Sequence, residues 1–531
     1  MFKFIGLGCV VLGAALLGAC GGQSSTTGTA AASTAHGTLA ESPPFRIASL
    51  SAAAFGAELS ANATSAGLLQ ITGAPICGVD FYYLKFWTQG GAAVPEVTES
   101  SGALMVPTGA APACSGARPI VLFAHGTQTD KTANMADITN PSNTEGVLVA
   151  AMFAAQGYIV VAPNYAGYDI STLGYHPFLN AVQQSGEMID ALAAARTALP
   201  GTFASATTDS GQLFITGYSQ GGYVAIATLR AMQAAGLPVT AAAGLSGPYA
   251  LEAFGDGLVF GAVDIGATVF APLLTTSYQK AYGNIYTATT DVYSTTYASG
   301  IDTLLPSSTP IDTIFATGLL PEQVVFDSTT PTVTIPGNAL LSAELTAALA
   351  VPSSTTNPFT PLFDAGFGMP YLLNNSFRLA YALDAAQNPD GAVPTPTAGV
   401  PLAAVAPTQT FRLALYKNDL RTAWAPKVPT LLCGGDQDPT VFYSVNTGTM
   451  QAFWAGVPTV AVLDVNATPA GPFASAQAGF QQYQAEQLAY YESAAGGSLT
   501  PLQAEEQLVA NYHANVAPFC AAAARGFFSQ F

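Results

Sequence analysis

Charged side chains are scarce in this sequence, and positive charge is the scarcest. Only 9% of the 531 residues are charged, and 14 Lys and Arg against 32 Asp and Glu give a formal net charge of −18 at pH 7. A chain this acidic lacks the basic surface needed to bind nucleic acid or anionic lipid headgroups. Half of its residues are apolar, which excludes intrinsic disorder and provides material for a large core. The length predicts one large domain with an insertion, or two domains.

Histidine and cysteine are also few, with four and six residues. No CxxC motif and no Cys/His cluster occurs, so neither a metal site nor a cofactor is predicted. Cys9 falls in the N-terminal apolar segment and Cys20 follows it. The remaining even number of cysteines predicts two disulfides in an exported chain. These are Cys77, Cys114, Cys433 and Cys520.

The N-terminus predicts export and lipid anchoring. Residues 1–19 have a positive Lys3 and then an apolar stretch too short to span a bilayer, as in a signal peptide. The sequence Leu-Gly-Ala-Cys ending at Cys20 resembles a bacterial lipobox, in which that thiol is acylated; the alternative is an ordinary secretory signal. Residues 20–45 predict a flexible tether. Gly21 after the cysteine resembles outer-membrane lipoproteins, so we expect an outer-membrane location, facing the periplasm or the cell surface, or release from the cell.

Buried apolar runs alternate with helical segments along most of the chain, which predicts an α/β fold. The expected strands are 81–87, 102–106, 119–124, 158–162, 213–216, 239–245, 428–433 and 459–465, the first two antiparallel. The expected helices are 49–69, 145–156, 181–199, 221–235 and 475–495. Such alternation is typical of a mostly parallel central sheet with helices on both faces.

The alternation stops between residues 250 and 425, after the sixth expected strand. This insertion divides the core into residues 46–249 and 426–531 and predicts a cap over the strand ends. Its most apolar part, from Leu258 to Leu274, is interrupted by Asp264, which argues against a membrane span. We expect a mobile lid element there that brings Phe260 to the substrate; a buried cap helix is the alternative.

The most informative motif is Gly-Tyr-Ser-Gln-Gly-Gly at residues 217–222. A Gly-x-Ser-x-Gly match is weak alone, but Ser219 here follows a buried strand and opens a helix. This is the context of a nucleophile elbow, in which a strained turn exposes the serine hydroxyl and small flanking residues let strand and helix approach. Ser219 is therefore the predicted nucleophile, with Tyr218 expected beside the substrate.

A serine nucleophile needs a histidine base and an acid that orients it. Of the four histidines only His513, expected in a polar loop after the last strand and helix, has the position that returns over the strand ends. His176 is the second candidate, or else a pocket-lining residue that contacts substrate. After the strand that ends near residue 433, Asp438 is favoured as the acid and Asp436 is the alternative.

The remaining site predictions follow from this arrangement. Two backbone N–H groups should form an oxyanion hole, one from Gln220 and the other from Thr127 in the turn after an early strand. If the acid and the base meet at the nucleophile, Cys433 and Cys520 must lie close together, which predicts the pairs Cys433–Cys520 and Cys77–Cys114.

The order Ser219, Asp438, His513 is that of α/β-hydrolases. The nucleophile motif, the His-Gly-Thr turn at 125–127 and the sequences at 164–168 and 175–179 resemble secretory lipases of the fungal lipase-A type and their bacterial lipoprotein relatives. That resemblance implies an α/β-hydrolase fold with a cap, no cofactor, and cleavage of carboxylic esters, lipids or other hydrophobic esters, by a monomer. A prolyl-oligopeptidase-type serine peptidase and a non-catalytic surface binding protein are the alternatives.

Overall fold

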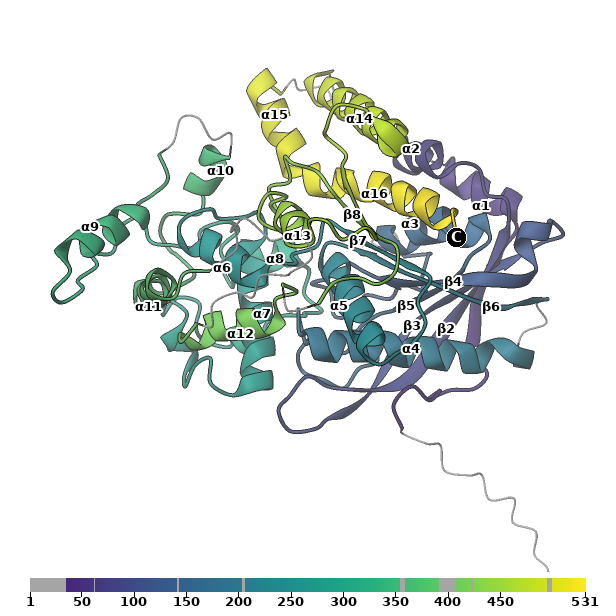
Figure 1. The fold of residues 1–531 in the computed structure, drawn as a ribbon, viewed down its shortest axis with the longest axis horizontal. Coiled ribbons are helices and arrows are strands. Elements are labelled where there is room, and N and C mark those ends of the chain that lie inside the picture. Colours follow the sequence, from purple (N-terminus) through teal and green to yellow (C-terminus); the bar gives the residue numbers. More distant parts are fainter. Residues whose placement is uncertain are drawn as a thin grey trace, which may run out of the picture. The chain divides into compact units, whose positions relative to one another are not determined.

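The core of the protein is one twisted sheet. A computed structural model describes residues 35–61, 63–140, 143–202, 206–353, 359–390, 407–421, 424–493 and 499–531. In this part of the chain, nine strands pair in the order β1-β2-β3-β5-β4-β6-β7-β8-β9 (Figure 1). Their bounds are β1 Phe45–Leu50, β2 Gly78–Gln89, β3 Val97–Thr108, β4 Gly116–Ala124, β5 Ile159–Pro163, β6 Thr207–Tyr218, β7 Ala241–Leu245, β8 Thr430–Gly434 and β9 Val460–Asp464.

The sheet is antiparallel at one end and parallel over the rest. Strands β1, β2, β3 and β5 pair antiparallel, while β5, β4, β6, β7, β8 and β9 pair parallel. Every residue of β5, β7 and β8 is buried, as expected of parallel strands covered on both faces. The predicted α/β architecture is confirmed.

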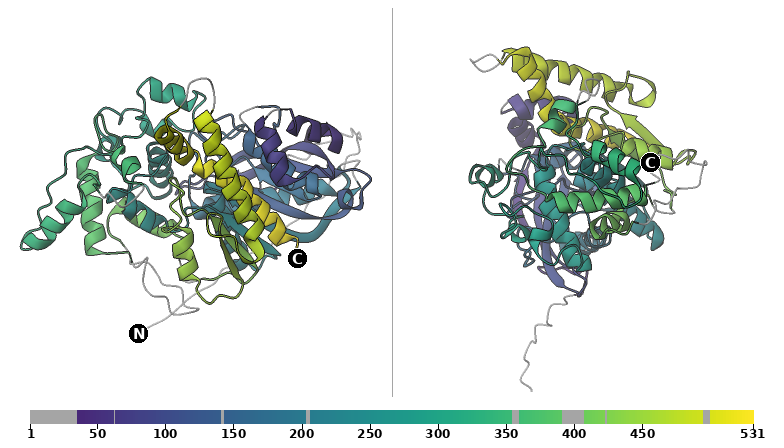
Figure 2. Two further views of the ribbon diagram at one scale, coloured as in Figure 1. Left: turned by 90° about the horizontal axis from the view of Figure 1, so that it is seen from above. Right: turned by 90° about the vertical axis from the view of Figure 1, so that its left-hand side faces the viewer.

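Helices cover both faces of the sheet and bury two separate apolar layers. On one face lie α4 (Ala181–Thr202) and α5 (Gln220–Ala234); on the other lie α1 (Ala52–Leu59), α2 (Ala63–Thr72), α3 (Thr144–Met152), α14 (Ala474–Ser493) and α16 (Tyr512–Phe528). Figure 2 shows α16 beside α2, although they come from opposite ends of the chain. Arg525 ties them, donating a hydrogen bond of 2.8 Å to the Thr72 carbonyl oxygen.

A helical insertion, residues 250–425, joins β7 to β8 and lies to the left in Figure 1. Its described helices are α6 (Leu251–Val259), α7 (Ala267–Tyr282), α8 (Ile311–Ala316), α9 (Ala339–Ala348), α10 (Thr360–Asp364), α11 (Asn375–Gln387) and α12 (Thr410–Asn418). Two further helices, α13 (Thr447–Phe453) and α15 (Pro501–Ala510), belong to the core part. Short 3-10 turns lie at Pro112–Cys114, Ala154–Gln156, Thr289–Asp291, Ile301–Thr303 and Gly471–Phe473.

Two N-terminal features differ from the predictions. Residues 49–69 are not one helix: β1 adds an edge strand to β2, and α1 and α2 follow. The end of the predicted tether is also held in place, because the N–H groups of Gly37 and Ala40 donate to carbonyl oxygens of β2. Both segments gain order from pairing with β2, a contact that local sequence does not encode. The predicted signal peptide and Cys20 lie outside the described residues.

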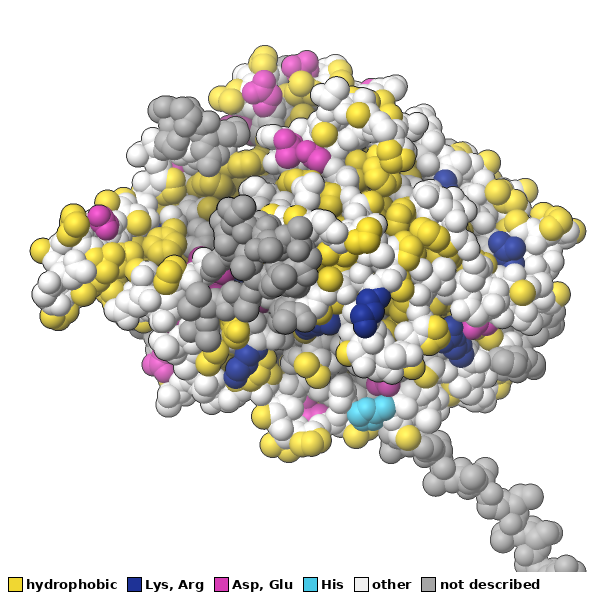
Figure 3. Space-filling view, viewed as in Figure 1, with side chains coloured by type: hydrophobic (Ala, Val, Ile, Leu, Met, Phe, Trp, Pro, Cys, Tyr) yellow, Lys and Arg dark blue, Asp and Glu magenta, His cyan; other side chains and the backbone are white. Residues whose placement is uncertain are grey.

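The surface carries little charge, and what there is lies scattered. Figure 3 shows basic and acidic side chains mostly singly, among polar and apolar ones. In the described part of the chain no helix is both long and apolar enough to cross a bilayer. The segment from Leu258 to Leu274 is divided between the end of α6, a turn and the first half of α7.

Both predicted disulfides are present. Cys77 and Cys114 are joined with their Cα atoms 5.3 Å apart, and Cys433 and Cys520 with theirs 5.6 Å apart. Cys114 lies just before β4, at the amino end of the parallel strands. Cys433 lies near the carboxyl end of β8 and connects this strand to α16.

Removing the Cys77–Cys114 bridge should lower stability and leave catalysis nearly unchanged. The bridge closes a loop of 37 residues, for which chain entropy gives about 4 kcal/mol. The double variant Cys77→Ser/Cys114→Ser should therefore lose about that much free energy of unfolding in urea titrations. Turnover of any substrate should stay within about twofold, since this bridge lies at the other end of the strands. Unchanged stability would contradict the expectation.

Candidate active site

Ser219 occupies a strained turn between β6 and α5. Its backbone has φ 58° and ψ −122°, a conformation that non-glycine residues rarely adopt. The flanking glycines make this turn possible. A Cβ on Gly217 would lie 2.4 Å from the Ala124 carbonyl oxygen, and a Cβ on Gly221 would lie 1.9 Å from the same atom. The structure thus has the predicted nucleophile elbow, with Ser219 facing a cavity.

Asp438 and His513 meet as predicted. His513 Nδ1 lies 2.7 Å from Asp438 Oδ2, and the Asp438 side chain is buried. The other carboxyl oxygen, Oδ1, accepts hydrogen bonds from the backbone N–H groups of Thr440 (2.9 Å) and Val441 (3.0 Å). Both oxygens are therefore fixed, and the carboxylate holds the imidazole with Nε2 directed away from it.

Asp436 has a different environment. It is exposed, and its Oδ1 accepts a hydrogen bond of 2.7 Å from the Asn466 side chain. Its backbone N–H donates to Asp464 Oδ1. This is the environment of a solvated turn carboxylate, so the geometry favours Asp438 of the two aspartates.

His513 lies in the first turn of α16 and not in the loop that the sequence predicted. The polar residues around it belong to the boundary between α15 and α16, where Asn511 serves both helices as a cap. Tyr218 packs against the imidazole, with ring centroids 5.0 Å apart, and its hydroxyl donates to the His513 carbonyl oxygen. His513 Nε2 has no hydrogen-bond partner among the described residues. The bond from the Ser219 hydroxyl to this nitrogen is therefore not formed in this structure.

The turn after β4 supplies the second wall of the site. A Cβ placed on Gly126 would lie 3.7 Å from the Ser219 Cβ, so this turn faces the nucleophile directly. The Gly126 N–H donates to both carboxyl oxygens of Glu145, at 3.0 Å each. Burial raises the pKa of Glu145 to about 7, and the Gly126 hydrogen bond offsets part of the shift. The sequence analysis did not single out Glu145; the only signal was an acidic residue in the first turn of α3.

The predicted oxyanion residues flank Ser219. Gln220 is the first residue of α5, where N–H groups have no partner within the helix. Thr127, next to Gly126, lines the same cavity. In the described part of the chain, neither the Gln220 nor the Thr127 backbone N–H has a hydrogen-bond partner. Both are therefore available as donors.

His176 supports Gln220 from behind and does not line the cavity. It is almost fully buried, and burial lowers its pKa to about 3, so the ring is neutral. Its Nδ1 donates to the Ala166 carbonyl oxygen (2.9 Å), and its Nε2 accepts from the Gln220 side-chain amide (2.7 Å). The ring has no free nitrogen to serve as a base. It orients Gln220 where substrate contact was predicted.

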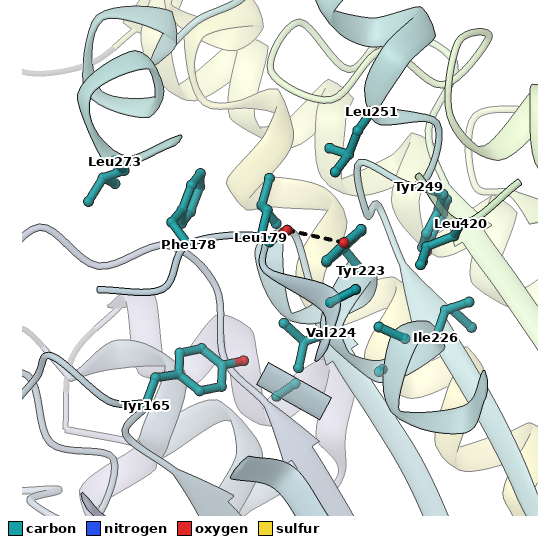
Figure 4. Packing of buried hydrophobic residues seen from close by; sticks show 14 of the residues in the cluster. Tyr165, Phe178, Leu179, Tyr223, Val224, Ile226, Tyr249, Leu251, Leu273 and Leu420 are labelled. Atoms are coloured by element: carbon teal, nitrogen blue, oxygen red, sulfur yellow. Dashed lines mark hydrogen bonds between the residues drawn. The ribbon is translucent and has the colours of Figure 1, made fainter. Parts of the chain in front are cut away.

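The cavity beside Ser219 is almost entirely apolar and extends between helices of the insertion. Phe178 and Leu251, both labelled in Figure 4, lie in its wall together with further side chains from α6, α7, α11 and α12. Figure 4 also shows the Tyr223 hydroxyl donating to the Leu179 carbonyl oxygen (3.1 Å), which fixes the loop that carries Phe178. The apolar wall residues are Phe178, Leu179, Leu251, Phe254, Leu258, Val259, Ala267, Phe270, Ala271, Leu274, Leu373, Phe377, Phe411, Leu415 and Val441, with Pro248 and Gly255.

Two predicted substrate contacts, Phe260 and Tyr218, lie outside this lining. Phe260 caps the end of α6 and packs against the core, whereas Phe254 and Phe270 reach the cavity. The sequence is apolar around both Phe260 and Phe270, so it did not distinguish which of the two rings faces the cavity. Tyr218 contacts His513, as described above.

Among the described residues, no group of three or more His, Cys, Asp or Glu side chains could hold a metal ion.

Comparisons with known proteins agree with this geometry. The crystal structure of a rice cell wall degrading esterase, LipA from Xanthomonas oryzae, matches at 25% identity and a TM-score of 0.59, covering 81% of this chain and 91% of that one. The chain has the α/β-hydrolase fold. A putative hydrolase from Legionella pneumophila shares it at 17% identity and a TM-score of 0.56, over 90% of this chain and 96% of that one. Candida antarctica lipase A matches at 11% identity and a TM-score of 0.43, over 81% of this chain and 76% of that one, which is too distant for comparing residues.

Sequence comparisons add one family. A model of the prolyl oligopeptidase family matches residues 146–237. No curated protein matches the sequence. The findings together support a hydrolase of the α/β-hydrolase type, and they confirm the resemblance to esterases of this superfamily that the motifs indicated.

The two aspartates offer a matched test of the site. Asp438→Asn should lower kcat by about four orders of magnitude, because the amide cannot hold the imidazole in the required tautomer. Asp436→Asn, two residues away, should stay within about threefold, because its exposed carboxylate accepts a single side-chain hydrogen bond among the described residues, from Asn466. Steady-state kinetics on both variants, with circular dichroism to verify folding, make this comparison. Equal losses in both variants would contradict the assignment.

Glu145 should make stability depend on pH. Its pKa of about 7 in the folded protein lies above the ordinary 4.5, so from pH 4.5 to 7 the folded protein keeps a proton that the unfolded chain loses. The free energy of unfolding should therefore fall as pH rises through this window, by about 3 kcal/mol from this group. In Glu145→Gln, whose amide oxygen still accepts the Gly126 N–H, that contribution should vanish. The free energy of unfolding can be measured by urea titration at several pH values. The same dependence on pH in the wild type and in Glu145→Gln would contradict this.

Proposed function

We propose that the protein is a serine hydrolase that cleaves carboxylic esters through an acyl-enzyme on Ser219. The observation that carries the proposal is the hydrogen bond of 2.7 Å between Asp438 and His513. It sets the imidazole tautomer that leaves Nε2 unprotonated and able to accept a proton. The strained elbow supports the proposal, because it leaves the Ser219 hydroxyl exposed at the cavity.

The chemistry follows from these groups. As the Ser219 oxygen attacks the ester carbonyl carbon, its proton passes to His513 Nε2, and the carbonyl oxygen becomes an oxyanion. The N–H groups of Gln220 and Thr127 stabilise that charge. The alcohol leaves with the proton from His513, and the acyl group stays on Ser219. Water then attacks the acyl-enzyme with His513 as base, which releases the acid and restores Ser219. The Ser219–His513 hydrogen bond must form when substrate binds.

An apolar acyl group suits the cavity. The wall beside Ser219 is formed by aliphatic and aromatic side chains from the sheet core and the insertion, so it binds hydrocarbon by burying it from water. The similarity to an esterase at 25% identity supports ester cleavage as the reaction. We therefore infer that the substrate is a lipid or other hydrophobic ester.

A serine peptidase is the second candidate, since a prolyl oligopeptidase model matches residues 146–237. That segment contains the elbow and the helices around it but neither Asp438 nor His513. It represents the part of the fold that esterases and peptidases share. Among the described residues of the cavity wall, Asp264 is the only acidic or basic side chain, and no basic side chain is present to pair with a peptide's C-terminal carboxylate.

We also propose that the protein is exported and held at the bacterial outer membrane through a lipid on Cys20. The support is the lipobox-like sequence that ends at this residue and the Gly-, Ser- and Thr-rich segment after it. The two disulfides are compatible with an oxidising compartment.

A substrate comparison with an active-site control tests the enzymatic proposal. The wild type should hydrolyse p-nitrophenyl esters and leave peptide p-nitroanilides intact, and Ser219→Ala should lower kcat roughly a millionfold. A fluorophosphonate should label wild-type Ser219 and no residue of Ser219→Ala. Faster cleavage of anilides than of esters would favour the peptidase. Labelling at another serine would contradict the nucleophile assignment.

A further inference from the structure

One acidic side chain interrupts the apolar cavity. Asp264 lies in the turn between α6 and α7, is 1% exposed, and contributes to the cavity wall. Among the other polar wall residues, Thr127, Ser219 and Gln220 belong to the proposed catalytic centre, and the Thr275 hydroxyl shares a hydrogen bond with Tyr293. The Tyr381 hydroxyl has no hydrogen-bond partner among the described residues, as is also true of one Asp264 oxygen, but Asp264 is the only acidic side chain in the described wall.

The backbone around Asp264 forms several hydrogen bonds, whereas one oxygen of its carboxyl group forms none. The Asp264 carbonyl oxygen accepts from the Ala267 N–H and the Gln323 side chain, and the Ile265 N–H donates to the Pro439 carbonyl oxygen. Asp264 Oδ2, in contrast, has no hydrogen-bond partner among the described residues. No ion pair with a described basic residue involves it either.

Its burial favours the uncharged form of this carboxyl group. Burial raises the pKa of Asp264 well above its ordinary value, and the nearby Asp438 carboxylate raises it further. A neutral carboxyl group carries an O–H that can donate and a C=O that can accept. A buried polar group without a hydrogen-bond partner destabilises the folded protein, so a carboxyl group at this place calls for a functional explanation.

A structural role does not account for the group. A carboxylate just before a helix often caps its N-terminus, but α7 begins after Gly266 and has no side-chain cap. Asp264 therefore neither caps α7 nor pairs with a cation. The Asp264 side chain lies in the wall of the space that the acyl chain would fill.

We propose that Asp264 selects acyl groups that carry a hydroxyl, so that the preferred substrates are esters of hydroxy fatty acids. The inference rests on the proposed ester hydrolysis. A hydroxyl is the simplest group that both accepts from the carboxyl O–H and donates to its C=O; an oxo group can only accept. The turn that holds Asp264 is bonded to the loop after Asp438, so the hydroxyl should lie near the ester end of the chain.

The test compares methyl decanoate with methyl 2-, 3- and 10-hydroxydecanoate, by pH-stat. In the wild type kcat/KM for at least one of the 2- and 3-hydroxy esters should exceed that for the plain ester by about tenfold. In Asp264→Leu the two kinds of ester should have kcat/KM values within about twofold of each other, and kcat/KM for the plain ester should rise. Asp264→Asn, whose amide still donates, should retain part of the preference. Thr275→Val, which removes another wall hydroxyl, should leave the ratio unchanged.

Other outcomes separate this inference from the proposed function. A wild-type ratio near one for every hydroxy ester, or an equal loss on both kinds of ester in Asp264→Leu, would overturn the inference while ester hydrolysis stands. If no ester is cleaved, the proposed function fails. Calorimetric binding of the same esters to Ser219→Ala then decides the inference: tighter binding of a hydroxy ester that disappears in Ser219→Ala/Asp264→Leu supports it, and equal binding refutes it.

Discussion

The approach of two backbones at Ala124 determines the rest of the site. The carbonyl oxygen that ends β4 touches the backbone of Gly217 and Gly221, with no room for a Cβ on either residue. This contact holds the strand, the strained turn at Ser219 and the start of α5 in one arrangement. Because the chain continues from Ala124 through His125 into Gly126 and Thr127, the contact also places the second proposed oxyanion donor in the wall of the same cavity as the first. A side chain at either glycine would push β4 away from this turn, and would thereby move the oxyanion turn after β4 away from Ser219.

Scarcity of charge shapes how the surrounding loops are held. Carboxyl groups near the site accept hydrogen bonds from backbone N–H groups and have no basic partners in these contacts. Glu145 binds the Gly126 N–H, and Glu187 binds the Ala166 N–H at 2.9 Å. The second contact continues through the Ala166 carbonyl oxygen to His176 and then to Gln220. The oxyanion region is thus fixed from both sides by acidic side chains, the partly buried Glu145 and the fully buried Glu187, and desolvation raises the pKa of each.

Sequence reasoning succeeded where chemistry needs a particular residue at a particular point of the fold. The elbow at Ser219, the Asp438–His513 contact and both disulfides followed from strand ends, chain order and the demand that partners meet. It did less well where only tertiary contact decides. The strand β1 forms because β2 offers an edge to pair with, and His513 lies in a helix because α16 packs on the sheet. Phe270 of α7 lines the cavity, whereas Phe260 at the end of α6 packs against the core. Glu145 and Asp264 carry no local signal, since their significance depends on what surrounds them.

Contacts within the insertion and one hydrogen bond to the core limit how a lid could move. Arg412 of α12 is fully buried, donates twice to Asp256 of α6 at 2.7 Å, and binds Asp384 of α11. Losing one partner of such a pair leaves an uncompensated buried charge, at a cost of about 3–5 kcal/mol. On the other side, the Ile265 N–H holds the turn before α7 to the loop that carries Asp438. Opening of the whole segment from Leu258 to Leu274 would have to break the bond to that loop and pull α6 against the Arg412 network. The predicted lid therefore has firm attachments at both ends. The same attachments keep Asp264 at a fixed place relative to His513, which a residue that selects the acyl group requires.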